Sequence, residues 1–170
     1  SLPIDVEIPR IKTKLRTNNT LILIAPPGSG KSTRVPPCLL SEYSGKIILL
    51  QPRRAAARLL AHRISEELES PVGALVGYQI RFEQRRSKQT RIEVLTEGVL
   101  LRRIQNDPFL DGIDVVILDE FHERSQSVDL LLALARYRPH SPLVVMSATL
   151  AEARLCAELK GTIVRGEGRS

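Results

Sequence analysis

A short segment near the start of the chain combines a lysine, glycines and hydroxyl residues in an order suited to binding phosphate. After an apolar run the sequence reads APPGSGKST, which fits the phosphate-loop pattern of a small residue, four variable positions and Gly-Lys-Ser. Glycine lets backbone N–H groups point at an anion, and a helix beginning near Lys31 adds the positive end of its dipole. The pattern predicts a nucleoside triphosphate site in which Lys31 reaches the β- and γ-phosphates and the Ser32 hydroxyl binds Mg²⁺. Ala25 stands where the pattern has glycine, and it is small enough if its φ is negative.

A second chemical segment begins where the apolar run 115–118 leads into Asp119-Glu120-Phe121-His122. A buried strand ending in aspartate delivers a carboxylate to the carboxyl edge of a parallel sheet, where a phosphate loop also opens. We expect Asp119 to hold Mg²⁺, largely through water, and Glu120 to orient or deprotonate the attacking water. His122 lies beside both carboxylates, which favours a relay role. An Asp-Glu pair alone would indicate only a solvated strand end, but its place downstream of a phosphate loop favours catalysis.

Elements that could position these residues are visible as β-rich apolar runs alternating with helical stretches. The predicted strands are Thr20–Ala25, Lys46–Gln51, Val76–Arg81, Arg91–Thr96, Asp114–Asp119, Leu143–Ser147 and Thr162–Arg165. The predicted helices are Lys31–Tyr43, Arg53–Glu69, Glu97–Asn106, Val128–Arg136 and Glu152–Leu159. This alternation predicts an α/β fold with a mainly parallel sheet and helices on both faces. Ala57, Leu60, Ile64 and Leu68 form the expected sheet-facing stripe of one helix, and Glu83–Gln89 is expected to be an exposed loop or hairpin tip.

Composition bounds the remaining possibilities. The 170 residues suit one domain, and no apolar stretch reaches the roughly 20 residues of a membrane span or resembles the core of a signal peptide. Cys38 and Cys156 are expected to be buried thiols in a reducing compartment, with a disulfide less favoured, and zinc-ligand spacing is lacking. The net charge is +6, and 19 of the 25 basic residues are arginine. Arginine suits phosphate, so nucleic acid is a reasonable partner, although a solvated arginine-rich surface explains the charge equally well.

Six segments taken in order identify a family resemblance. They are APPGSGKST, QPRRAAARLLAHR, VGYQIRFE, TEGVLLRRIQ, DEFHERS and MSATL. Together they resemble the first RecA-like lobe of the DEAH-box helicases of superfamily 2, and APPGSGKSTRVP with DEFHERS resembles the bacterial HrpB-type branch. The resemblance covers roughly Leu21–Ser170. It implies that residues 1–170 form a single RecA-like, P-loop ATP-binding domain, and that a second RecA-like lobe and C-terminal domains lie outside this sequence.

The resemblance assigns expected roles in nucleotide chemistry. The implied nucleotide-binding residues are Pro27, Gly28, Ser29, Gly30, Lys31, Ser32, Thr33 and Arg63, and the implied catalytic residues are Lys31, Asp119, Glu120, His122, Ser147 and Thr149. Ser32 and Asp119 would bind Mg²⁺, and Arg63 would stack on the nucleobase. Ser147-Ala148-Thr149 matches the motif that couples hydrolysis to movement between lobes. An adenine-specifying glutamine motif is lacking upstream, so ATP should be discriminated only weakly from other nucleoside triphosphates. Phe121 stands where the family's name has alanine, which we interpret as a packing difference.

The resemblance also implies partners. The expected nucleic-acid residues are Arg53, Arg54, Arg81, Thr96 and Gly98, with Arg81 guiding the strand and the others contacting backbone phosphates. Such contacts do not identify sequence, so binding should tolerate sequence and weaken with salt. For the arginines the alternative is a solvated helix face. The implied partners are RNA or single-stranded DNA and the second RecA-like lobe, with no membrane, in a bacterial cytoplasm.

Several functions remain open from the sequence. An ATP-dependent RNA helicase leads, because the DEAH-box resemblance favours RNA. A DNA or dual-substrate translocase stays open, because phosphate contacts cannot sense a 2′-hydroxyl unless a donor is placed for it. A nucleotide-dependent binding module without unwinding is less favoured, because Lys31, Asp119 and Glu120 are all intact. Another P-loop machine, such as a transport ATPase, is disfavoured by the arginine-rich segment after the second strand and by Ser147-Ala148-Thr149.

Overall fold

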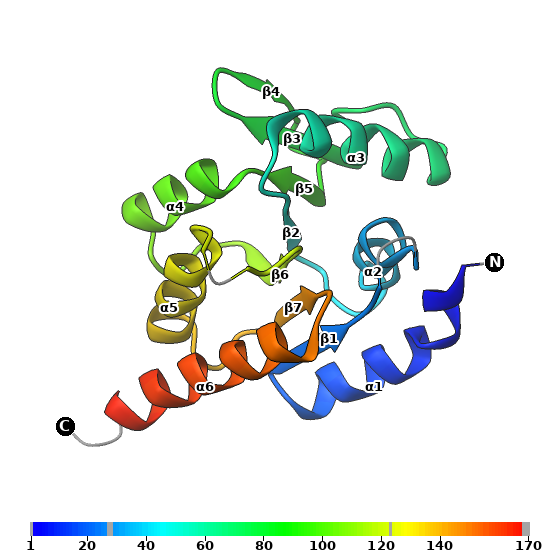
Figure 1. Ribbon diagram of the computed structural model, residues 1–170. Helices are drawn as coiled ribbons and strands as arrows, with labels where there is room; N and C mark the ends of the chain where they lie inside the picture. Colours follow the sequence, from blue (N-terminus) through cyan, green and yellow to red (C-terminus); the bar gives the residue numbers. More distant parts are fainter. Residues whose placement is uncertain (1, 27–28, 123, 168–170) are drawn as a thin grey trace.

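A seven-stranded sheet runs through the computed structural model, which describes residues 2–26, 29–122 and 124–167 (Figure 1). The strands are β1 (Thr20–Ile24), β2 (Lys46–Leu50), β3 (Val76–Ile80), β4 (Glu83–Arg85), β5 (Ile92–Leu95), β6 (Ile113–Leu118) and β7 (Leu143–Ser147). The helices are the 3-10 helix η1 (Pro3–Val6), α1 (Ile8–Thr17), α2 (Lys31–Cys38), α3 (Arg54–Glu67), α4 (Glu97–Asn106), α5 (Ser127–Tyr137) and α6 (Leu150–Glu167). The order across the sheet is β1-β7-β6-β2-β5-β3-β4, and only the β3–β4 pair is antiparallel.

Helices cover both faces of this sheet, as the alternating sequence pattern predicted (Figure 1). Successive residues of a strand point to opposite faces. Ile47 and Leu49 accordingly belong to the core cluster that buries apolar residues of α1, α2 and α3. Ile48 and Leu50 belong to the cluster that buries apolar residues of α4, α5 and α6. The central strands are therefore apolar along their whole length, because neither of their faces meets water.

The stripe predicted on the Arg53–Glu69 helix is confirmed. Ala57 and Ile64 of α3 are fully buried, and Leu60 and Leu68 are half-buried against the same cluster. Contacts of α3 with β3 and β5 place this helix over the sheet on the side where the chain turns back into the β3–β4 hairpin. The start of α3 is thus held at the carboxyl edge of the sheet, next to the ends of β2 and β6.

The last predicted strand, Thr162–Arg165, is wrong. Helix α6 begins at Leu150 and continues through these residues to Glu167, so the predicted helix Glu152–Leu159 is too short rather than misplaced. A run as brief as Thr162-Ile163-Val164 fits a strand and the continuation of a helix equally well, so its residue types could not decide between them.

The end of one helix and the presence of another also differ from the sequence predictions. Helix α2 ends at Cys38 rather than Tyr43, and Pro36 and Pro37 inside it lack the N–H groups that would bond to the preceding turn. The amino-terminal helix α1 was not predicted, although Ile4, Ile11 and Leu15 all join the core. The run Glu83–Gln89, predicted to be an exposed loop or hairpin tip, begins instead with strand β4, which pairs with β3 in a hairpin whose tip is Arg81-Phe82.

Both cysteines are free thiols, as expected. Cys156 is buried and Cys38 half-buried, and burial raises the pKa of Cys156 to about 12 and that of Cys38 to about 11. Among the described residues, no helix has the length and apolar character that a membrane crossing requires.

Candidate nucleotide site and nucleic-acid interface

The phosphate loop leaves the carboxyl end of β1 and returns as the first turn of α2. The Ala25 N–H donates to the Ser147 carbonyl (3.1 Å), so the loop starts tied to β7. Gly30 has a φ of 91°, a left-handed conformation that glycine adopts without strain, immediately before α2 begins at Lys31. The Thr33 hydroxyl donates to the Gly30 carbonyl (3.3 Å). Pro27 and Gly28 lie outside the described residues.

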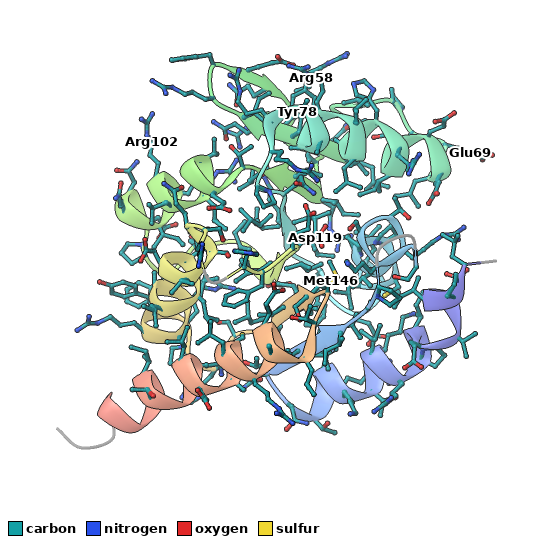
Figure 2. All side chains as sticks on the ribbon, in the orientation of Figure 1. Arg58, Glu69, Tyr78, Arg102, Asp119 and Met146 are labelled. Atoms are coloured by element: carbon teal, nitrogen blue, oxygen red, sulfur yellow. The ribbon has the colours of Figure 1, made fainter. Side chains whose placement is uncertain are left out.

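Lys31, Ser32 and Asp119 converge although their strands are not neighbours. Strand β7 lies between β1 and β6, yet the Ser32 hydroxyl donates to Oδ2 of Asp119 over 2.5 Å. The Lys31 ammonium is buried and donates to the Ala25 carbonyl over 3.1 Å. The first turn of α2 thereby meets the Asp119 carboxylate, which lies near the centre of the molecule in Figure 2.

The Asp119 carboxylate is held in an environment that a cation would complement. It is 1% exposed, and burial raises its pKa above the ordinary value, opposed by the Ser32 hydrogen bond and the positive charge of Lys31. A hydroxyl and a carboxylate oxygen side by side are hard donors of the kind that Mg²⁺ prefers. Within the described residues no cluster of three or more His, Cys, Asp or Glu gathers, so most ligands of such an ion would be phosphate oxygens and water. The residues present therefore fit a Mg²⁺–nucleotide.

Glu120 points away from Asp119 because the backbone turns sharply between them. Its φ is 54°, and its N–H donates to Oδ1 of Asp119 (2.9 Å). Its own carboxylate is exposed and accepts a hydrogen bond from Nη2 of Arg53 (3.4 Å). The next residue, Phe121, is buried, and its N–H donates to the Met146 carbonyl (3.0 Å). Phe121 thus packs in the core and anchors the turn that presents Glu120.

His122 is exposed, but local hydrogen bonds hold its position. Its Nδ1 accepts from the Arg124 N–H (3.1 Å), and its backbone N–H donates to the Ser127 hydroxyl (3.3 Å). Those bonds tie His122 to the start of α5 while its side chain faces the same cavity as Glu120.

Ser147 and Thr149 connect the end of β7 to the start of α6. The buried Ser147 hydroxyl donates to the Thr149 carbonyl (3.2 Å), and the Thr149 hydroxyl accepts from the Glu152 N–H (3.2 Å) in the first turn of α6. Only Ala148, between them, lines the cavity beside the phosphate loop. Displacement of this segment would therefore move α6 together with the cavity wall.

A cavity of about 620 Å³ joins these elements. Its lining includes Gly30, Lys31, Ser32, Thr33, Arg63, Asp119, Glu120 and His122 of the predicted nucleotide and catalytic residues, together with Arg53, Ala148 and Glu152. Arg63 of α3 lines the same cavity as Lys31 and Ser32. Ser29, Ser147 and Thr149 do not line this cavity: Ser29 and Ser147 are buried, and Thr149 is exposed.

Leu2 is a cavity residue that the sequence motifs missed. Its side chain lies against the phosphate loop, so that a Cβ added to Gly30 would stand 2.4 Å from Leu2 Cδ1. The Ile4 N–H donates to the Ser29 carbonyl (3.1 Å), which ties the amino-terminal segment to the loop itself. The helical spacing of Ile4, Ile11 and Leu15 could have predicted a core-facing element here. No sequence pattern, however, indicates that this amino-terminal segment packs against the phosphate loop.

A second hollow, of about 640 Å³, lies between the β3–β4 hairpin and α4. We call it the arginine groove, and its lining residues are Gln79, Ile80, Arg81, Phe82, Arg86, Thr96, Gly98, Val99, Arg102, Arg103 and Asn106. Three of the five predicted nucleic-acid residues, Arg81, Thr96 and Gly98, lie here. Sequence reasoning missed Arg86, Arg102 and Arg103. None of the described lining residues is acidic, so the groove suits an extended polyanion.

The other two predicted nucleic-acid residues lie outside the groove. Arg53 lines the nucleotide cavity and pairs with Glu120, whereas Arg54 donates from Nη2 to the Arg81 carbonyl (3.2 Å) at the hairpin tip. Adjacent residues at the start of α3 thus contact the nucleotide cavity and the edge of the arginine groove.

Glu93 of β5 anchors the floor of the arginine groove. Its carboxylate is fully buried yet surrounded by Arg103 of α4, Arg86 beyond β4 and Lys46 of β2, all within salt-bridge distance. Burial raises its pKa, but the surrounding positive charges outweigh that effect and leave the pKa below its usual value. Nη2 of Arg103 also donates to Oε1 of Gln79 (2.6 Å). A single buried charge therefore holds two groove arginines in place.

Comparison with known proteins places this architecture in a family. The chain is 47% identical to the ATP-dependent RNA helicase HrpB of Escherichia coli K12, in an alignment covering all of this chain and 22% of that protein. It is 38% identical to the human probable ATP-dependent RNA helicase DHX40, over 92% of this chain and 22% of that protein.

Structural comparison agrees. A crystal structure of the E. coli DExH-box NTPase HrpB matches with a TM-score of 0.83 and 47% identity, over 94% of this chain and 20% of that one. The predicted RecA-like fold is thereby confirmed, and the chain spans about a fifth of the length of the relatives it matches. The family model described as DEAD/DEAH box helicase matches residues 8–156. The chain therefore belongs to the DEAD/DEAH-box helicase family.

Proposed function

We propose that residues 1–170 form a single RecA-like ATP-binding lobe of an ATP-dependent nucleic-acid helicase that acts on RNA. In the longer protein, hydrolysis of ATP to ADP and phosphate would drive movement along a strand. The observation that carries the proposal is the hydrogen bond from Ser32 to Asp119 beside the buried Lys31, at a cavity with room for a nucleotide. Support for RNA comes from the relatives, which are named as ATP-dependent RNA helicases. Their bacterial member and the free thiols support a bacterial cytoplasmic setting.

The chain's own residues suit phosphoryl transfer to water. The Lys31 ammonium would exchange its bond to the Ala25 carbonyl for phosphate oxygens, with the backbone N–H groups around Gly30 beside it. Ser32 and Asp119 would hold Mg²⁺, whose charge offsets that of the phosphates when it is bound. Glu120 would orient the attacking water and accept its proton, because its carboxylate faces the cavity and, among the described residues, hydrogen-bonds to Arg53 alone.

Coupling between nucleotide and nucleic acid has a short physical route in this proposal. Arg53 pairs with Glu120 at the cavity, and Arg54 holds the Arg81 carbonyl at the rim of the arginine groove. A change in the charge facing Glu120 would therefore bear on the start of α3, and through it on the hairpin. Ser147-Ala148-Thr149 provides the second route, from the cavity wall into α6.

The test measures ATP turnover by the full-length protein with RNA, with single-stranded DNA and without polymer. We expect RNA to stimulate turnover most. Glu120→Gln should retain nucleotide binding but lose about 100-fold or more in kcat, the contribution usual for a positioned general base. Glu158→Gln, a matched change at an exposed position of α6, should behave as wild type. Equal turnover with RNA, with single-stranded DNA and without polymer would contradict the helicase assignment. Stimulation by DNA alone would favour the DNA translocase.

A further inference from the structure

Phe82, at the tip of the β3–β4 hairpin, is exposed in a way that folding does not explain. Its side chain is 89% exposed, and its φ of 67° lies in the left-handed region that bulky residues rarely adopt. Because the side chain is exposed, its apolar surface contributes little to the stability of the fold. Strained residues of this kind persist where the surrounding structure holds them, and they cluster at ligand-binding sites.

Polar contacts hold the hairpin tip on both sides of Phe82. Before it, the Arg81 carbonyl accepts from Arg54 (3.2 Å). After it, the Glu83 carboxylate accepts from Nε and Nη2 of Arg58 (2.9 and 2.7 Å) and from the Tyr78 hydroxyl. Figure 2 shows Arg58 and Tyr78 close together beside the hairpin. The ring is therefore presented by a braced turn rather than by a loose loop.

The surroundings of Phe82 indicate what its ring could contact. It lines the arginine groove with Arg81, Arg86, Arg102 and Arg103, and the Arg81 guanidinium lies 4.8 Å from the ring centroid. A ligand for this groove must combine spaced negative charges with flat apolar surfaces. A single strand of nucleic acid has both, because its phosphates repeat along the backbone and each base carries an exposed π-face.

We propose that Phe82 stacks on an unpaired base of the bound strand while the groove arginines contact the flanking phosphates. This inference rests on the proposed nucleic-acid function and adds a reason for the choice of substrate. In a duplex both faces of a base are covered by its neighbours, so a ring at the groove wall favours single-stranded segments. Stacking depends on the π-face rather than on hydrogen-bonding edges, so the contact tolerates any base.

The experiment compares full-length wild type, Phe82→Ala and Phe82→Trp by fluorescence anisotropy. One ligand is a short oligouridylate, and the other is an oligomer of the same length and charge whose central positions are abasic. Phe82→Ala should bind the oligouridylate about tenfold more weakly, within the range for one base–aromatic stack, and the abasic oligomer as wild type does. Phe82→Trp, which keeps an aromatic ring, should bind the oligouridylate more tightly than the abasic oligomer, as wild type does.

Two controls separate stacking from other effects. Phe109→Ala removes another exposed aromatic, one that packs edge-on against Tyr137 outside the groove, and should leave both affinities unchanged. Phe82→Ala should also leave the salt dependence of binding unchanged, whereas Arg102→Gln should lower its slope by about one, because only the latter loses a phosphate contact.

Three outcomes would overturn the inference. Unchanged affinity of Phe82→Ala for oligouridylate would show that the ring contacts no base, while a weakened Arg102→Gln would leave the nucleic-acid function standing. Equal losses on both oligomers would mean that the ring packs against another part of the protein and acts through folding. Failure of wild type to bind either oligomer would overturn the proposed function as well.

Discussion

At the level of single residues, Gly98 is a position where folding does not explain the presence of glycine. It is exposed in the first turn of α4 at the arginine groove, and a Cβ added there would meet no atom within 4 Å. Its φ lies outside the left-handed region, unlike that of Gly30. Neither packing nor backbone conformation therefore requires glycine at this position. We propose that a bound strand approaches the backbone here.

Gly98→Ala is accordingly expected to change stability and binding in opposite directions. Alanine should stabilise α4 by up to about 1 kcal/mol, because it loses less backbone freedom on folding. Its methyl group should hold a backbone phosphate away from the Thr96–Gly98 turn and weaken RNA binding several-fold. Urea unfolding and RNA anisotropy on the same preparation measure both effects, with nucleotide affinity as the internal control. A more stable protein with unchanged RNA affinity would contradict a contact at Gly98.

At the level of elements, the β3–β4 hairpin depends on an ionised Glu83. Hydrogen bonds from Arg58 and then Tyr78 lower the pKa of Glu83 from its ordinary 4.5 to about 2. A carboxyl whose folded pKa is depressed contributes stability above its unfolded pKa, and this contribution is lost as pH falls through the folded value. The hairpin contribution is therefore complete above about pH 5 and disappears between about pH 4.5 and pH 2.

Glu83→Gln should therefore flatten part of the acid limb of the stability profile. The free energy of unfolding, measured with urea at a series of pH values, should fall less steeply in the variant across that acid window. Arg58→Gln should remove the same dependence, and the double variant should add little, because both changes delete one interaction. Independent, additive effects of the two substitutions would contradict the assigned pairing.

At the level of the whole molecule, residues 1–170 provide one side of the proposed nucleotide site. Its described lining comes from the phosphate loop and Leu2, from Arg53 and one side of α3, from the Asp119–His122 turn, and from Ala148 and Glu152. Under the proposed function, a second RecA-like lobe of the longer protein would close over this cavity and supply an arginine finger. Such a finger is worth roughly 10³–10⁵ in rate in related phosphoryl-transfer enzymes.

Residues 1–170 by themselves should consequently bind nucleotide weakly and hydrolyse it very slowly. We expect turnover about 10³-fold or more below that of the full-length protein, even at saturating RNA. The comparison uses phosphate release from both proteins at matched concentrations, with circular dichroism to confirm that the shorter chain is folded. Rapid RNA-stimulated hydrolysis by residues 1–170 would contradict the proposed contribution of a second lobe to catalysis.

The sequence alone was sufficient for the features that depend on local chemistry. The phosphate loop, the Asp119-Glu120 segment and the six parallel strands were predictable because each needs particular residue types at short spacing or a continuous apolar run. Local patterns were insufficient at Thr162–Arg165, where so short a β-branched run fits strand and helix alike. They also missed α1, whose helical spacing had no motif to draw attention to it.

Only the tertiary structure determined which distant residues meet. It placed β7 between β1 and β6 yet brought Ser32 to Asp119, seated Leu2 on the phosphate loop, and gathered Arg86 and Arg103 around the buried Glu93. It also placed Phe82, Arg86, Arg102 and Arg103, to which the motifs had given no role, in one groove with Arg81, Thr96 and Gly98. The physical reason is that an apolar run specifies burial but not its neighbours, whereas strand order and helix packing decide which side chains share a site.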